Sequence, residues 1–171
     1  VGLRGGYKNF ERLLLAYADS VKLKSNYDLV CFGGGTFTKK EIGIIDSVDL
    51  KTCIIRQTSV SDDKLAYYYT RAHAFVFPSL YEGFVIPPLE AINYSCPVVC
   101  SNISSIPEIV GDAGLFFDPN DNQSIKLSLE RIVSDTSLRE RLITHGKERI
   151  KHFSWEKCAE DTLAVYRKFL L

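Results

Sequence analysis

Short apolar runs alternate with amphipathic segments along most of this chain, and this alternation is the feature that most restricts its fold. The short runs, bounded by Gly, Pro or polar residues, have the character of strands and lie at 27–35, 52–55, 73–79, 96–101 and 114–117. Apolar residues recur at helical spacing in the segments between them, at 10–23, 38–48, 61–72, 87–95 and 105–111. Short, continuously apolar strands that alternate with helices are typical of βαβ units, in which a parallel sheet is buried on both faces.

Both ends of the chain complete the predicted fold. The first residues, Val1 and Gly2, have the character of the last step of a strand, and everything after Asp121 is helical in pattern, at 122–135, 137–152 and 154–171. We therefore predict one α/β domain over 1–171, Rossmann-like and three-layered, with a parallel sheet of about six strands. Because the chain contains no Met, we interpret it as a fragment of a longer protein.

The charge balance excludes one large class of function. Basic and acidic residues number 21 each, so the formal net charge is zero, which argues against a surface built mainly for nucleic acid. No apolar run approaches the roughly 18 residues needed to span a bilayer, and no signal peptide precedes the first element. We expect a cytoplasmic protein, either free or at the inner face of the membrane.

The cysteines point to the same compartment. There are five, an odd number, and no Cys-x-x-Cys pair. Cys31, Cys53 and Cys100 lie in apolar, strand-like runs, so we predict reduced thiols, three of them buried. The three His are scattered along the chain, and we predict no metal site.

The unusual stretches of the sequence all lie where the sheet would bind a ligand. A parallel sheet binds beyond the carboxyl ends of its strands, where loops meet helix N-termini. Five stretches rich in Gly, Ser, Pro or charge occupy such places: 2–9, 33–38, 59–63, 79–88 and 101–108. We expect the functional residues of these loops to lie at one edge of the sheet.

Two of these stretches are rich in glycine. The first, "GLRGGYKN", carries Arg4 and Lys8, which suit a phosphate or diphosphate; a flexible turn with two solvated charges is an equal alternative. The second, "GGGTFTKK" at 33–40, matches neither G-x-G-x-x-G nor the P-loop pattern. A tight strand-to-helix turn is the favoured interpretation, and a backbone contact to a nucleotide is the alternative.

The stretch 81–92, "YEGFVIPPLEAI", places a carboxylate on each side of a Pro-Pro pair. Glu82 precedes the predicted helix, Glu90 lies within its first turns, and the amides of 84–86 fall at its start. Such amides bind anions or sugar hydroxyls, and proline has no N–H to compete with them. The alternative is a loop acid at 82 and a charge that complements the helix dipole at 90.

The chain from Phe77 to Asp121 resembles the nucleotide-binding half of retaining glycosyltransferases of the GT-B fold, glycosyltransferase family 4. The family's signature of two Glu separated by seven residues matches at Glu82 and Glu90. The similarity extends in register over 1–18, 59–79 and 153–170. Within the family, the first loop is most similar to mannosyltransferases of bacterial surface polysaccharide assembly.

The resemblance implies a role for each matching residue. Arg4 and Lys8 would hold the donor diphosphate, and Glu82 the transferred sugar. The remaining donor contacts would come from Glu90 at the ribose, from the backbone near Val60 at the base, and from the backbone of Gly83, Phe84, Val85 and Ile86 at sugar and phosphate. The chain departs from the family at two positions. Val85 stands where Gly is usual, and Leu3 stands where the Arg is usual, so that Arg4 comes one position later than in the family.

The resemblance also implies the activity. A hexose, with mannose from GDP-mannose favoured over a UDP-linked sugar, would pass to a glycan or lipid-linked acceptor without a cofactor. The acceptor site would lie on an N-terminal domain absent from 1–171, so this fragment alone would be inactive. A GT-B nucleotide-sugar epimerase and a non-catalytic nucleotide-sugar-binding module are the alternatives.

Overall fold

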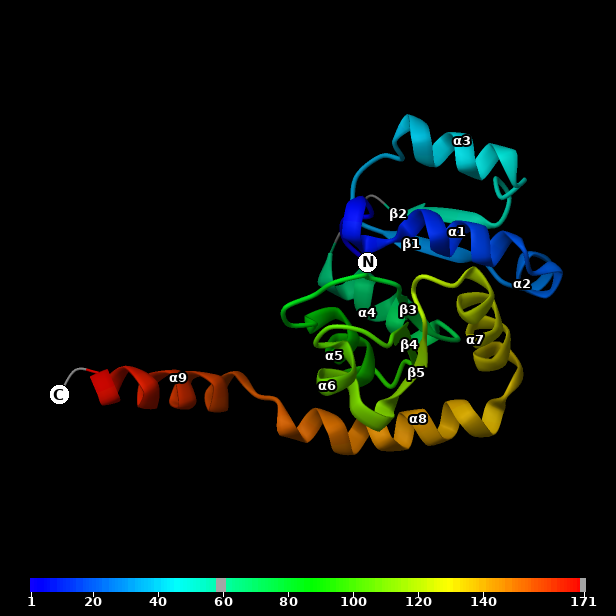
Figure 1. Cartoon of the computed structure of the whole chain (residues 1–171). Coiled ribbons are helices and arrows are strands. Elements are labelled where there is room, and N and C mark those ends of the chain that lie inside the picture. The colour runs from blue at the N-terminus through cyan, green and yellow to red at the C-terminus, as the bar shows by residue number, and fades with distance from the viewer. Residues whose placement is uncertain (58–60, 170–171) are drawn as a thin grey trace.

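The structure, a computed structural model, describes residues 1–57 and 61–169 (Figure 1). The strands are β1 (Leu29–Phe32), β2 (Ile54–Gln57), β3 (Phe75–Phe77), β4 (Val98–Ser101) and β5 (Gly114–Phe117). The α-helices are α1 (Phe10–Ala18), α2 (Val21–Asn26), α3 (Lys39–Ser47), α4 (Asp62–Arg71), α5 (Ile86–Asn93), α6 (Ile106–Val110), α7 (Asn122–Ser134), α8 (Thr136–Arg149) and α9 (Trp155–Phe169). Short 3₁₀ turns are η1 (Gly6–Lys8), η2 (Gly111–Ala113) and η3 (Ile150–His152).

Every strand pairing in the described part of the chain is parallel, as predicted. The strands form two sheets, one of order β1-β2 and one of order β3-β4-β5, instead of a single sheet of about six. Val1 and Gly2 lie between β1 and β3, where they line a cavity of about 90 Å³. The amide of Gly2 donates to the carbonyl of Phe32 at 2.9 Å. The facing edges of β1 and β3 are therefore separated by the start of the chain.

Two hydrophobic cores cover the two faces of the strands, which confirms the three-layer α/β arrangement. Successive side chains of β4 point to opposite faces of the sheet. Val98 and Cys100 belong to the core with α5 and α6, whereas Val99 belongs to the core with α1 and α7. On β3, Phe75 and Phe77 face the same core as Val98. Helices α1, α2, α3, α7 and α8 thus line one core, and α4, α5 and α6 line the other.

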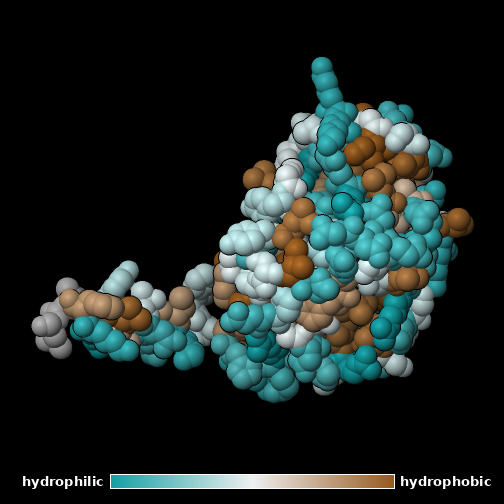
Figure 2. Space-filling model, viewed as in Figure 1, coloured by the Kyte–Doolittle hydropathy of each residue, from teal (hydrophilic) through white to brown (hydrophobic). Residues whose placement is uncertain are grey.

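The last helix stands apart from this layered body. In Figure 1, α9 projects away from the domain beyond the end of α8, and none of its residues is buried. Its exposed apolar side chains include Trp155, Leu163, Tyr166 and Phe169. Figure 2 shows apolar and polar surface side by side along this helix. Every helix in the described part of the chain is too short or too polar to form a transmembrane span.

Several local predictions are confirmed. Ser61 caps α4, because its hydroxyl accepts a hydrogen bond from the Lys64 amide at 3.3 Å, and each described element after Asp121 is helical. All five cysteines are free thiols. Three are buried as predicted, but they are Cys31, Cys96 and Cys100, whereas Cys53 is half-buried. Cys53 precedes β2, the outer strand of the two-stranded sheet, in which Ile55 is 36% exposed.

Candidate functional site

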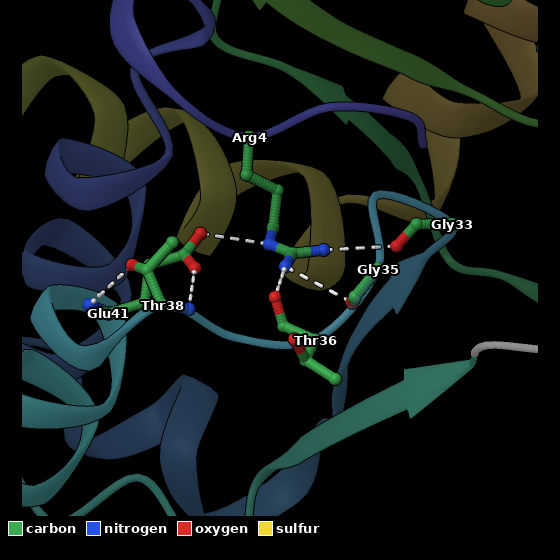
Figure 3. Close-up of polar contacts among 6 residues, drawn as sticks. All are labelled: Arg4, Gly33, Gly35, Thr36, Thr38 and Glu41. Carbon is green, nitrogen blue, oxygen red and sulfur yellow. Dashed lines mark hydrogen bonds and ion pairs between the residues drawn. The ribbon is translucent and has the colours of Figure 1, made fainter.

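Arg4 is held inside the protein by the loop that follows β1 (Figure 3). Its Nε donates to Oε1 of Glu41 at 2.9 Å, and its terminal nitrogens donate to the carbonyls of Gly33, Gly35 and Thr36. The side chains of Arg4 and Glu41 are 8% and 7% exposed. Four hydrogen bonds use most of the five donors of a guanidinium. The structure therefore gives Arg4 a role in folding this loop, and its contact with a diphosphate stays a prediction.

The Gly33–Gly35 segment needs its glycines. All three residues have positive φ, at 77°, 70° and 70°, a conformation that costs other residues strain. At Gly34 a Cβ would also lie 2.5 Å from the Gly2 carbonyl oxygen and 2.6 Å from an Arg4 nitrogen. These features confirm the tight strand-to-helix turn predicted here.

Glu41 links this turn to the start of α3. Thr38 and Glu41 form a capping box, in which the Thr38 hydroxyl accepts from the Glu41 amide and the Glu41 carboxylate accepts from the Thr38 amide. Burial acts to raise the pKa of Glu41, but the hydrogen bonds from Thr38 and Arg4 outweigh it, and the net pKa lies below the usual value. The carboxylate therefore stays charged opposite Arg4 at neutral pH.

Lys8 and Glu82 form the second ion pair of this edge. Lys8 ends η1, and its Nζ lies 2.6 Å from Oε1 of Glu82; the two side chains are 24% and 12% exposed. The ammonium also lies over the rings of Tyr7 and Phe77, with the ring centroids 5.0 and 5.6 Å away. The amide of Leu80 donates to the Tyr7 carbonyl at 2.7 Å, which ties η1 to the loop after β3. Two loops far apart in sequence thus present one cation and one carboxylate together.

The backbone of Glu82 is fixed by the loop after β4. The hydroxyls of Ser104 and Ser105 both donate to the Glu82 carbonyl, at 2.7 and 2.9 Å, and the Glu82 amide donates to the Ser104 hydroxyl at 3.3 Å. Ser104 itself has a positive φ of 58°. The 101–108 stretch was expected at this edge of the sheet, but the sequence did not assign a role to these two serines.

The start of α5 leaves backbone donors open. No side chain caps this helix, and Pro87 and Pro88 lie in its first turn. Within 1–57 and 61–169, none of the amides of 83–86 donates a hydrogen bond to another protein group. Gly83, Phe84 and Ile86 are exposed, whereas Val85 is fully buried and packs in the core beneath α5. Since the Val85 side chain points into the core, the departure from the usual Gly does not block the loop.

Glu90 lies in the second turn of α5. Together with Phe84 and Ile86 it lines a cavity of about 510 Å³ between α5 and the segment 150–161. One of its oxygens, Oε2, accepts a hydrogen bond from the hydroxyl of Tyr69 at 3.3 Å. Lys8 lines the cavity of about 90 Å³ between β1 and β3. Lys8 and Glu90 thus line two different cavities, and their convergence on one donor site stays a prediction.

The remaining candidates concern the base and metals. Val60, predicted to lie near the base, is outside the described residues. In the described ranges, no group of three or more His, Cys, Asp or Glu side chains is arranged to hold a metal ion. Sequence reasoning missed Glu41 and Tyr69. A Thr-x-x-Glu pattern at 38–41 could have revealed the first, whereas no local pattern marks the second.

A family model described as glycosyl transferases group 1 matches residues 1–149. The chain belongs to this family. The roles of Glu82, Glu90 and Lys8 in donor binding stay predictions. The α/β fold agrees with the C-terminal half of the GT-B fold predicted above.

Several known proteins are similar to this chain. O-antigen chain mannosyltransferase B from Escherichia coli is 47% identical over 108 residues, covering 63% of this chain and 28% of that protein. MMP alpha-(1->4)-mannosyltransferase from Mycolicibacterium hassiacum is 34% identical over 132 residues, 75% of this chain and 31% of that protein. Sucrose-phosphate synthase from Thermosynechococcus elongatus superposes with a TM-score of 0.87 at 26% identity, over 99% of this chain and 44% of that one. The chain thus spans less than half the length of each of these proteins.

Proposed function

We propose that this chain is the donor-binding part of a retaining glycosyltransferase that moves a hexose, mannose from GDP-mannose, to a glycan or lipid-linked acceptor. Membership of the glycosyl transferases group 1 family supports the reaction class. The names of two relatives, both mannosyltransferases, support the sugar. The acceptor would bind to a part of the protein outside residues 1–171, and the reaction would take place in the cytoplasm, free or at the inner face of the membrane.

One observation carries the proposal: the 2.6 Å contact between Lys8 and Glu82 beside the open amides of α5. In a nucleotide sugar, the transferred sugar is bonded directly to the diphosphate. A site for it needs a hydroxyl acceptor and a cation in adjacent positions. Glu82 and Lys8 supply these two groups, and the pair keeps both charges balanced until the donor arrives.

The open amides add a third element to the site. Free N–H groups at a helix start attract a phosphate oxygen through direct hydrogen bonds and through the helix dipole. The amides of Phe84 and Ile86 lie in the exposed part of the loop between the two carboxylates. The diphosphate would therefore lie at this helix start, with the sugar toward Glu82 and the ribose toward Glu90.

In this proposed arrangement, each residue would have a distinct role in the reaction. Negative charge grows on the leaving diphosphate as the glycosidic bond breaks, so Lys8 and the helix start would stabilise the transition state more than the bound substrate. Glu90 would contact ribose hydroxyls, which do not change during the reaction. Glu82 would orient the sugar.

The test uses the full-length protein and a panel of GDP-, UDP- and ADP-linked hexoses. We expect binding and transfer with GDP-mannose, both weakened in Glu82→Ala. Lys40→Ala is the matched control. Lys40 forms an exposed ion pair with Glu11, at a distance of 2.7 Å, and is not among the proposed donor contacts. A protein that interconverts the donor sugar without an acceptor would be an epimerase. One that binds the donor but neither transfers nor interconverts its sugar would be a binding module, and either result would refute the proposal.

A further inference from the structure

The hydroxyl of a buried tyrosine is directed at Glu90. Tyr69 lies on α4 and is 3% exposed. Its hydroxyl donates to Oε2 of Glu90 at 3.3 Å, and the Pro87 carbonyl oxygen lies 3.5 Å away. A tyrosine has one hydroxyl proton, and a charged acceptor forms the stronger hydrogen bond. Glu90 is therefore the main partner of this hydroxyl.

Packing fixes where the hydroxyl can be. The Tyr69 ring stacks on Tyr94, with centroids 5.9 Å apart and an interplanar angle of 18°. It also meets the edge of Phe75 at 5.4 Å and 86°. Because α5 carries Glu90 and Tyr94 follows that helix directly, the ring is held against the same segment that its hydroxyl contacts. Tyr69 thus has a fixed position from which to orient the carboxylate.

The two oxygens of Glu90 have different surroundings. Oε2 accepts from Tyr69, whereas in the described part of the chain Oε1 has no hydrogen-bond donor, and the residue lines the cavity beside Phe84 and Ile86. Burial raises the pKa of Tyr69, and the charge of Glu90 raises it further. The hydroxyl therefore remains a donor over the whole working pH range.

We propose that Tyr69 is a positioning residue for Glu90, holding one carboxylate oxygen so that the other faces the ribose hydroxyls of the donor. This inference rests on the proposed function, in which Glu90 contacts the ribose. Tyr69 acts through Glu90 and does not touch the donor. A role confined to core packing would need the ring but not the hydroxyl.

Tyr69→Phe separates these roles, because phenylalanine keeps both aromatic contacts and loses only the hydroxyl. In the full-length protein with GDP-mannose, we expect the donor KM to rise about threefold to tenfold with kcat within about twofold of wild type. Tyr67→Phe, exposed on the same helix, should leave both unchanged. Tyr17→Phe removes a buried hydroxyl that lies within hydrogen-bonding distance of the Leu23 and Tyr27 carbonyls, and should lower stability without changing KM.

A double-mutant cycle with Glu90→Ala completes the test. If Tyr69 acts through Glu90, adding Tyr69→Phe to Glu90→Ala causes no further rise in the donor KM. Suppose that Glu90→Ala raises the donor KM. An unchanged donor KM in Tyr69→Phe, or additive effects in the double variant, would then overturn the inference. If Glu90→Ala also left KM unchanged, or if no GDP-, UDP- or ADP-sugar bound at all, the proposed function would fail and this inference with it.

Discussion

The Nζ atom of Lys8 lies 2.6 Å from Oε1 of Glu82, although 74 positions separate the two residues in the sequence. Loop η1 and the loop after β3 must both be in place to form this pair. The 2.7 Å hydrogen bond from the Leu80 amide to the Tyr7 carbonyl connects the two loops directly. The charged pair is thus built by backbone structure and does not depend on two flexible side chains alone.

Lys8→Ala should lower kcat by about tenfold to a hundredfold, because charge on the diphosphate grows as the bond breaks and the lost contact is charge-assisted. Steady-state kinetics of the full-length protein with its acceptor measure this. Lys40→Ala, at the exposed pair with Glu11, is the control and should leave kcat unchanged. A Lys8→Ala variant that changed only the donor KM would show that Lys8 binds the ground state and the transition state equally.

Glu90→Ala should have the opposite kinetic pattern. Ribose contacts are the same before and during bond breaking, so their loss is expected mainly in the donor KM, by about tenfold to a hundredfold. Titration of GDP alone gives an independent measure, since the ribose is present without the sugar. A Glu90→Ala variant with a lower kcat and an unchanged affinity for GDP would contradict the ribose role.

Local sequence patterns account for most of the fold. Ser61 before a helical run and the Pro-Pro pair in the first turn of α5 marked helix starts that the structure confirms. Cys53 was misjudged because an apolar run does not reveal whether both faces of a strand are covered. The number of sheets differed from the prediction for a similar reason. Whether β1 and β3 pair depends on the segment that lies between them, and the residues of one apolar run do not determine this.

The candidate site was only partly accessible from the sequence. Glu82 and Glu90 were found because a local motif carries them. The partner of Arg4 lies 37 positions away at Glu41, and that of Glu90 lies 21 positions away at Tyr69. Such pairs are set by how α3 and α4 pack, and a single sequence contains no local trace of that packing.

Gly34 offers a test of the turn that holds Arg4. Gly34→Ala would introduce strain at a φ of +70° and a Cβ 2.5 Å from the Gly2 carbonyl oxygen. Gly35→Ala is a matched control, with the same φ but no atom within 4 Å of the new Cβ. We expect about 1–2 kcal/mol of destabilisation in Gly35→Ala and a clearly larger loss in Gly34→Ala, measured by denaturant unfolding. Equal losses would mean that the backbone near Gly2 moves aside freely.

The cysteines should differ in reactivity. Burial raises the pKa of Cys31 to about 11 and that of Cys96 to about 12, whereas Cys158 is exposed on α9. Because the thiolate is the reactive form, iodoacetamide at pH 8 should label Cys158 first in the native chain, and all five thiols only after unfolding. Mass spectrometry of the labelled peptides follows this. Equally fast labelling of Cys96 in native protein would show that the core beneath α5 opens readily.

The Arg4–Glu41 pair predicts how stability depends on pH. The pKa of Glu41 is lowered in the folded protein from its usual value of 4.5, so the unfolded chain binds this proton more readily. The contribution of Glu41 to stability is therefore complete above the unfolded pKa and is lost as the pH falls from about 4.5 through the lower folded pKa. Above this pH range, Glu41 does not contribute to the pH dependence of stability.

Glu41→Gln should remove this part of the acid sensitivity. We expect the variant to be less stable than wild type at pH 7, because Arg4 loses a buried charged partner, and to lose less stability between pH 5 and 3. Denaturant unfolding at a series of pH values measures both quantities. Glu11→Gln is the control, since its pair with Lys40 is exposed and such pairs contribute little. If the wild type and Glu41→Gln lost stability in parallel below pH 4.5, the acid sensitivity would come from other carboxylates. The hydrogen bonds from Arg4 and Thr38 would then not be what keeps Glu41 charged.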